Sequence, residues 1–140
     1  MKATLKAGVK ATFSYTVPVE KTVPYIYRES DEMQAMPEVF ATGFMVALME
    51  WACVRALAPH LEEGEGSVGV HVDISHDAAT PPGLTVTVDA EVTEVDGRRV
   101  WFFVRAHDGV DQIGEGYHQR AVVKWDSFMR RVGEKKAKAD

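Results

Sequence analysis

The sequence has 140 residues, of which 46% are hydrophobic and 26% charged, a composition typical of one globular domain over residues 1–140 rather than of a disordered chain. The formal net charge of -5 argues against a nucleic-acid partner. Cys53 is the only cysteine, which excludes an internal disulfide and cysteine-rich zinc sites, so we expect no metal. Early lysines interrupt any signal peptide, and the longest uncharged apolar stretch, residues 41–49, is too short to span a bilayer. We therefore expect a cytoplasmic protein that has no membrane partner.

Residues 9–17 alternate between apolar and polar side chains, which predicts a half-buried strand that Pro18 closes. Residues 18–37 have no clean period, and Pro24 and Pro37 indicate an irregular segment or short helical turns. Because long irregular segments in small domains often cover binding sites, we expect residues 18–37 to form a lid-like segment.

A long helix is predicted from Glu38 to about Ala58, since this stretch is rich in Ala, Leu and Met and is followed by Pro59. Beyond its first residue, only Glu50 and Arg55 are charged in it. A helix that is apolar on nearly every side must be covered on nearly every side, so we expect it to lie at the centre of the fold.

Downstream of this helix, apolar residues recur at every second position, which predicts four more strands. Asp96-Gly97 and Asp108-Gly109 are hairpin signals. We expect the tail, residues 134–140, to be frayed. The predicted strands cover residues 68–74, 84–92, 100–106 and 113–125.

This order of elements predicts an α+β fold in which an antiparallel sheet of about five strands wraps around one long central helix, as in the hotdog fold. One sheet covers only one side of the helix. A second copy of the chain would cover the rest most simply, so we expect a homodimer with its sites at the seam.

Glu50 is the first candidate for a functional residue, because a carboxylate in an apolar helix costs several kcal/mol unless it is paired or hydrogen-bonded. Thr42 lies two turns earlier and about 80° round the helix, so both side chains could face one cavity. The structural alternative is that the Thr42 hydroxyl bonds the backbone at the helix start and that Glu50 pairs with an arginine such as Arg55.

His76 continues the even-numbered apolar series of its strand, so without a bulge it points toward the helix. An inward histidine is more often a satisfied core residue than a catalytic one. Together with an inward glutamate and a nearby hydroxyl, however, it provides the parts of an orienter, base and nucleophile set. We therefore take Thr42, Glu50 and His76 as the candidate catalytic residues.

Two further positions could bind substrate. Gly69 interrupts a strand, which can mark a bulge or a close ligand, and its amide could stabilise an oxyanion. Arg120 has the parity opposite to Ile113, Ala121 and Val123, so it is expected to leave its own core and to reach a partner subunit, a phosphate or solvent. Cys53 is expected to be a small core residue. The other histidines are expected to be solvated or to support the site from outside it: His60, His71, His107 and His118.

Three segments of the chain together resemble one known family: PEVFATGFMVALMEWACVRALAPHLEEGEGSVG, AATPPGLTVTV and AHDGVDQIGEGYHQRAV. The sequence is similar to the fluoroacetyl-CoA thioesterases of the hotdog superfamily along nearly its whole length. This resemblance implies a homodimeric acyl-CoA hydrolase that needs no cofactor, since coenzyme A is part of the substrate. It places the family's catalytic threonine, glutamate and histidine on Thr42, Glu50 and His76, and its substrate-contacting glycine and arginine on Gly69 and Arg120.

The lid departs from the family pattern. The family carries lid phenylalanines that cover the fluoroacetyl group, and Met33 and Met36 stand at the corresponding positions here. Methionine is more flexible than phenylalanine, so we expect the thioesterase activity to be kept but the selectivity for fluorine to be reduced.

Two other functions compete with hydrolysis: a hotdog enoyl-CoA hydratase, which would not release CoA thiol, and a non-catalytic acyl-CoA-binding protein, which would tolerate His76→Ala.

Overall fold

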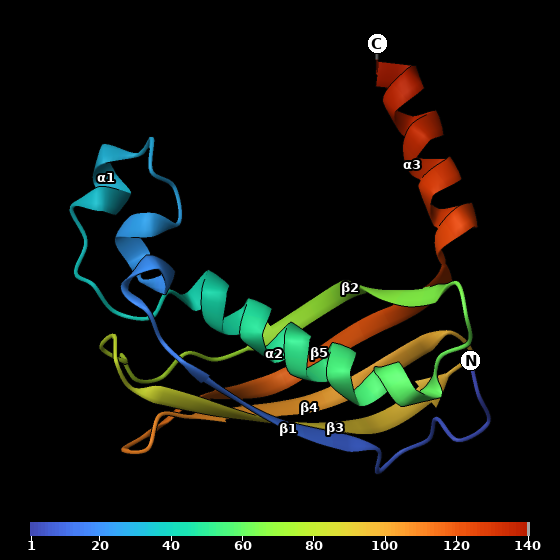
Figure 1. Cartoon of the computed structure of the whole chain (residues 1–140), viewed down its shortest axis with the longest axis horizontal. Coiled ribbons are helices and arrows are strands. Elements are labelled where there is room, and N and C mark those ends of the chain that lie inside the picture. The colour runs from blue at the N-terminus through green and yellow to red at the C-terminus, as the bar shows by residue number, and fades with distance from the viewer. Residues whose placement is uncertain (140) are drawn as a thin grey trace.

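The computed structural model describes residues 1–139, and it confirms the α+β prediction. Five antiparallel strands form one sheet in the order β1-β3-β4-β5-β2, and a long helix, α2, lies across one face of it (Figure 1). The strands are β1 (Lys10–Thr16), β2 (Glu65–Ile74), β3 (Thr85–Asp96), β4 (Arg99–His107) and β5 (Gln112–Lys124). The helices are α1 (Asp31–Gln34), α2 (Thr42–Leu57) and α3 (Trp125–Ala139), with short 3-10 turns η1 (Val19–Lys21), η2 (Val23–Tyr25) and η3 (Ala58–His60).

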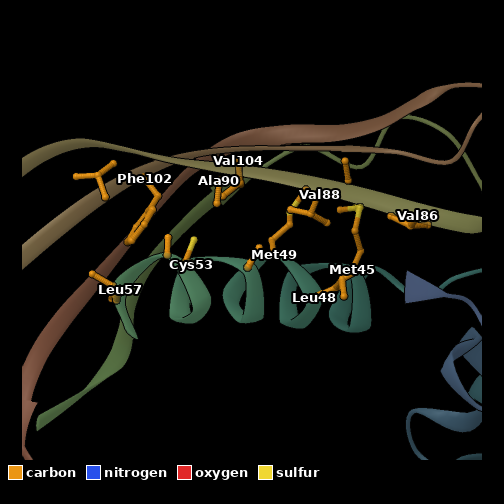
Figure 2. Close-up of a cluster of buried hydrophobic side chains, with 14 of the residues drawn as sticks. Met45, Leu48, Met49, Cys53, Leu57, Val86, Val88, Ala90, Phe102 and Val104 are labelled. Carbon is orange, nitrogen blue, oxygen red and sulfur yellow. The ribbon is translucent and has the colours of Figure 1, made fainter. Parts of the chain in front are cut away.

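The core lies between α2 and the sheet. Met45, Met49 and Cys53 point from the helix toward Val88 and Ala90 on β3, and all five are at most 1% exposed (Figure 2). Burying side chains of this size contributes about 1.5–3 kcal/mol for each large residue. The prediction that Cys53 is a core residue is confirmed, and burial raises the pKa of its thiol to about 12, which keeps it protonated.

Helix α2 begins at Thr42, four residues later than predicted. Before it the chain is extended, because the Phe40 amide donates to the Thr80 carbonyl (2.7 Å) and the Ala41 amide donates to the Lys21 carbonyl (3.1 Å). These two bonds hold residues 40 and 41 away from helical geometry. Thr42 is therefore the first residue of the helix rather than part of its second turn.

A bulge divides β2 into two halves whose side chains alternate in opposite phase. The register shifts between Gly69 and His71, so Gly69 lies opposite Arg120 whereas Val72 lies opposite His118. Val68 lies opposite Ala121 and on the other face of the sheet from Val72, so the predicted single apolar face of residues 68–74 is wrong. After the bulge the even-numbered residues face α2.

The alternation in β5 also differs from the prediction. A register shift where β4 ends puts Gly114 opposite Ala106, and His118 then lies opposite Phe102 in the core. Arg120 is only 6% exposed, so the prediction that it leaves its own core is wrong. His118 is fully buried, which excludes the solvated role predicted for it but not the predicted role of supporting the site from outside. The inward face of β5 is built largely from Gly, His and Arg, and apolar periodicity does not detect it.

The tail also differs from expectation, because the chain is helical through Ala139 instead of being frayed from residue 134. Glu, Lys and Ala in this stretch are good helix formers. Helix α3 projects away from the sheet (Figure 1), and Trp125 at its start packs over Gly66. Among residues 1–139, no helix combines the length and apolar character needed to cross a membrane.

Candidate active site

The first part of the site is the imidazole pair, formed by Thr42 and His76. Thr42 is exposed in the first turn of α2, and His76 follows the end of β2 by two residues. Thr42 Oγ1 lies 2.7 Å from His76 Nδ1, which is a hydrogen bond. Burial lowers the pKa of His76, so the imidazole is neutral near pH 7 and can accept a proton.

The other ring nitrogen of His76 has no hydrogen-bond partner. Nε2 is buried, and no atom in residues 1–139 bonds to it. A buried polar atom of this kind is costly, so such atoms are frequently found where a site is completed by another molecule.

The second part is the arginine cluster, formed by Glu50, Ser67, Gly69, His118 and Arg120. Arg120 Nη1 donates to Glu50 Oε1 at 3.0 Å. Its Nε donates to Ser67 Oγ at 2.8 Å, and its Nη2 donates to the Ser67 carbonyl at 2.9 Å. These bonds fix the guanidinium plane, as is typical of Arg–carboxylate recognition.

Gly69 makes room for this cluster. A Cβ atom at position 69 would lie 2.6 Å from Glu50 Oε1 and 3.1 Å from His118 Cε1. Any larger residue there would therefore displace the glutamate. The bulge that places Gly69 opposite Arg120 lies where the interrupted strand had indicated one.

Within one chain, the imidazole pair and the arginine cluster do not meet. Eight residues of α-helix separate Thr42 from Glu50, a rise of about 12 Å along the axis. Within a single chain, Glu50 is held by Arg120 and His76 by Thr42, so the expected meeting of Glu50 with His76 stays a prediction for the seam between two chains.

The structural alternative is wrong for Thr42, and for Glu50 it is right that the partner is an arginine but wrong that this arginine is Arg55. The Thr42 hydroxyl bonds His76 rather than the helix backbone. Arg55 lies over the ring of Phe13, 4.3 Å from its centroid, while Glu50 pairs with Arg120.

Sequence reasoning missed Ser67 and underrated His118. Both face α2 because of register shifts in β2 and β5. The glycine at position 69 was the only local signal of the first shift, and His118 carried no signal beyond its residue type.

The lid-like segment lies beyond the amino-terminal end of α2, the end that carries Thr42 (Figure 1). It contains η1, η2 and α1, as the prediction of short helical turns requires. At its base, Ile26 Cδ1 lies 3.8 Å from the position of a Cβ on Gly43, the residue after Thr42. Met33 is half-buried in α1, and Met36 is 47% exposed.

Within residues 1–139, no group of three or more His, Cys, Asp or Glu side chains could hold a metal ion.

Comparison with known proteins identifies the family. Residues 25–126 match the model of the fluoroacetyl-CoA-specific thioesterase family. The chain belongs to this family. It is 56% identical over 135 residues to the fluoroacetyl-CoA thioesterase of Streptantibioticus cattleyicolor, a match that covers 96% of this chain and 97% of the relative. The resemblance inferred from the sequence is thus confirmed.

Solved structures agree with this assignment. A fluoroacetyl-CoA thioesterase superposes with a TM-score of 0.92 at 56% identity, covering 94% of this chain and 97% of the other. A threonine-to-alanine variant of such an enzyme, in complex with fluoroacetate, gives a TM-score of 0.91 at 56% identity, covering 94% and 98% of the two chains. A thioesterase superfamily member of Thermus thermophilus is 30% identical, with a TM-score of 0.84 and 99% of each chain covered.

Proposed function

We propose that this protein is an acyl-CoA thioesterase that hydrolyses fluoroacetyl-CoA or a similarly small acyl-CoA. The observation that carries the proposal is the hydrogen bond between the Thr42 hydroxyl and the His76 imidazole, which burial keeps neutral. The family membership supports the substrate class. Solved relatives in complex with fluoroacetate, and with acetyl-CoA, support it further.

In the proposed reaction, His76 takes a proton from the attacking oxygen, which belongs to the Thr42 hydroxyl or to a water molecule held by it. The new bond forms to the thioester carbonyl carbon and the carbon–sulfur bond breaks. The CoA sulfur leaves and takes the proton held by His76. If water attacked, this step releases the acid directly; if Thr42 attacked, water then adds to the acyl-threonine ester, the bond from the carbonyl carbon to the Thr42 oxygen breaks, and the acid and the free hydroxyl are restored. The attacking oxygen has to lie within hydrogen-bond reach of His76, which Thr42 satisfies at 2.7 Å.

We further propose that a second copy of the chain completes the site. In residues 1–139 no strand pairs with the outer edge of β2, where Val70 and Val72 are 42% and 48% exposed. Trp51 and Val54 are exposed on α2. Long apolar edges and uncovered apolar helix faces are unusual in a monomer.

A homodimer would also bring the imidazole pair and the arginine cluster together, although they lie apart within one chain. If the imidazole pair of one copy faces the arginine cluster of the other, a carboxylate comes close to the imidazole whose Nε2 has no partner in its own chain. Glu50, which the resemblance implies is catalytic, then orients His76, positions water or itself provides the attacking oxygen. The cytoplasmic location stays a prediction.

Mixing two inactive variants tests this arrangement. Thr42→Ala and Glu50→Gln chains are each assayed for thiol release from fluoroacetyl-CoA, acetyl-CoA and longer acyl-CoAs, and are then unfolded and refolded together. We expect the mixture to recover about a quarter of wild-type activity, since half of the dimers are mixed and each carries one intact site. No recovery, with both variants still dimeric, would overturn the shared site.

The wild-type assay tests the activity itself. Absence of thiol release from all of these substrates would overturn the thioesterase. Consumption of an enoyl-CoA without thiol release would indicate the hydratase instead.

A further inference from the structure

We propose that His118 and Ser67 are positioning residues that hold Arg120, and through it Glu50, in one arrangement for catalysis. This inference rests on the proposed function, because it explains how the glutamate of that reaction is oriented. It concerns Ser67, for which the sequence indicated no role, and His118, which was expected only to be solvated or to support the site from outside it. They act through Arg120 and need not touch the substrate.

All three nitrogens of the Arg120 guanidinium are engaged. Ser67 accepts two of the bonds, one through its hydroxyl from Nε and one through its carbonyl from Nη2. Nη1 lies 3.0 Å from Glu50 Oε1 and 3.2 Å from His118 Nε2. With four acceptor contacts around a 6% exposed residue, the planar group has one orientation that satisfies it.

His118 is held as an acceptor by its other nitrogen. Nδ1 lies 2.7 Å from the His71 carbonyl, and a carbonyl only accepts, so Nδ1 carries the proton. In the neutral ring Nε2 is then bare and presents its lone pair to Arg120 Nη1. Burial lowers the pKa of His118, which agrees with this neutral form.

This cluster determines where the Glu50 carboxylate sits. The Glu50 side chain is 37% exposed, so packing alone does not restrain it. The bond from Nη1 fixes Oε1, and the space left by Gly69 admits it. A displacement of Arg120 therefore displaces the carboxylate, and misplacing a catalytic group by about 1 Å can cost up to about 10²-fold in rate.

Two substitutions at position 118 separate positioning from packing. In His118→Gln the amide reaches the place of Nε2 and can still accept from Arg120, but the bond to the His71 carbonyl is lost. In His118→Asn the amide reaches only the place of Nδ1, so the bond to His71 remains and the acceptor for Arg120 is lost. Both variants remove the ring and leave a buried amide.

We expect His118→Asn to lower kcat about 10–100-fold, the usual cost of removing a group that orients a site residue, with KM changed less than about threefold. His118→Gln should stay within about fivefold of wild type, and Ser67→Ala, which retains the carbonyl acceptor, should fall between them. The matched control is Gln119→Ala, since residue 119 is the next on β5 and faces the other side of the sheet. Equal losses in the Asn and Gln variants would show a packing role and overturn the proposal.

A spectroscopic measurement tests the cluster independently of turnover. The Arg120 Nε–H proton, bonded to half-buried Ser67, should give a slowly exchanging NMR signal in the wild type and in His118→Gln. The signal should exchange at least about tenfold faster in His118→Asn and in Ser67→Ala, because protection depends on the local bonds. Unchanged exchange in both variants would overturn the proposal even if the enzyme is active. Loss of protection together with an inactive wild type would refute the proposed function and leave the cluster in place.

Discussion

The imidazole pair and the arginine cluster each include one residue of α2, Thr42 and Glu50, but the pair is incomplete within its own chain and the cluster is satisfied. His76 has one hydrogen bond and one buried nitrogen without a partner in residues 1–139. Arg120 has every guanidinium nitrogen engaged. The difference indicates that the arginine cluster is preorganised by the fold alone, whereas the imidazole pair gains its full set of contacts from another molecule.

Removing the imidazole should give the largest effect. We expect His76→Ala to lower kcat/KM by about 10²–10⁴-fold, which is the usual contribution of a general base. Because Thr42 is exposed, losing their hydrogen bond should change the melting temperature little. Thiol release and thermal unfolding are measured in parallel, with His60→Ala as the control for loss of an imidazole. A His76→Ala enzyme with more than a third of wild-type activity would remove this pair from the mechanism.

Two glycine substitutions should separate an effect on the arginine cluster from a general loss of stability. Gly69→Ala places a methyl group 2.6 Å from Glu50 Oε1, so the flexible carboxylate must move, and we expect kcat to fall about 10–100-fold. Gly66→Ala pushes instead against the Trp125 ring. It should lower the free energy of unfolding by about 1–3 kcal/mol with little change in kcat. Equal kinetic effects of the two substitutions would contradict the assigned role of position 69.

The pH dependence should sharpen the comparison, since burial lowers the pKa of both His76 and His118. The base must be neutral, so kcat/KM should fall about tenfold per pH unit only below a pKa that lies under 6.5. A histidine whose pKa is lowered by folding binds fewer protons in the folded state than in the unfolded state. Stability should therefore decrease as the pH falls below about 6.5, and less so in His118→Gln. A pH-rate profile and melting temperatures from pH 7.5 to 5 test both statements, and an acid limb centred above 6.5 would contradict the first.

The smallest effect is expected at the lid, which lies at the end of α2 that carries Thr42. Met36→Phe should raise the preference for fluoroacetyl-CoA over acetyl-CoA by only a few fold, about 2–10, because a hydrophobic pocket discriminates weakly between similar acyl groups. The ratio of kcat/KM for the two substrates measures it. Indistinguishable ratios in the two proteins would show that the lid side chain does not set selectivity.

Much of the fold and part of the site could be predicted from local patterns. The apolar helix and the existence of the strands follow from periodicity and agree with the structure. His76 also lies toward α2, but the even-numbered series that it continues faces α2 only in the half of β2 that follows the bulge. The expectation that Glu50 needs a buried partner was also correct, although the partner is Arg120 rather than Arg55. The predicted side-chain directions are wrong where a bulge or register shift interrupts a strand, because a period of two residues assumes an unbroken register.

The sequence by itself determined the element order, the central helix, the family and the residue types available for catalysis, because these depend on local composition and spacing. Only the tertiary structure decided which group each residue contacts. The bulge after Gly69 and the shift at the start of β5 turned Ser67, His118 and Arg120 toward α2. A one-residue change of register reverses the direction of every later side chain, and the pairing of distant strands rather than local sequence determines where such a change occurs.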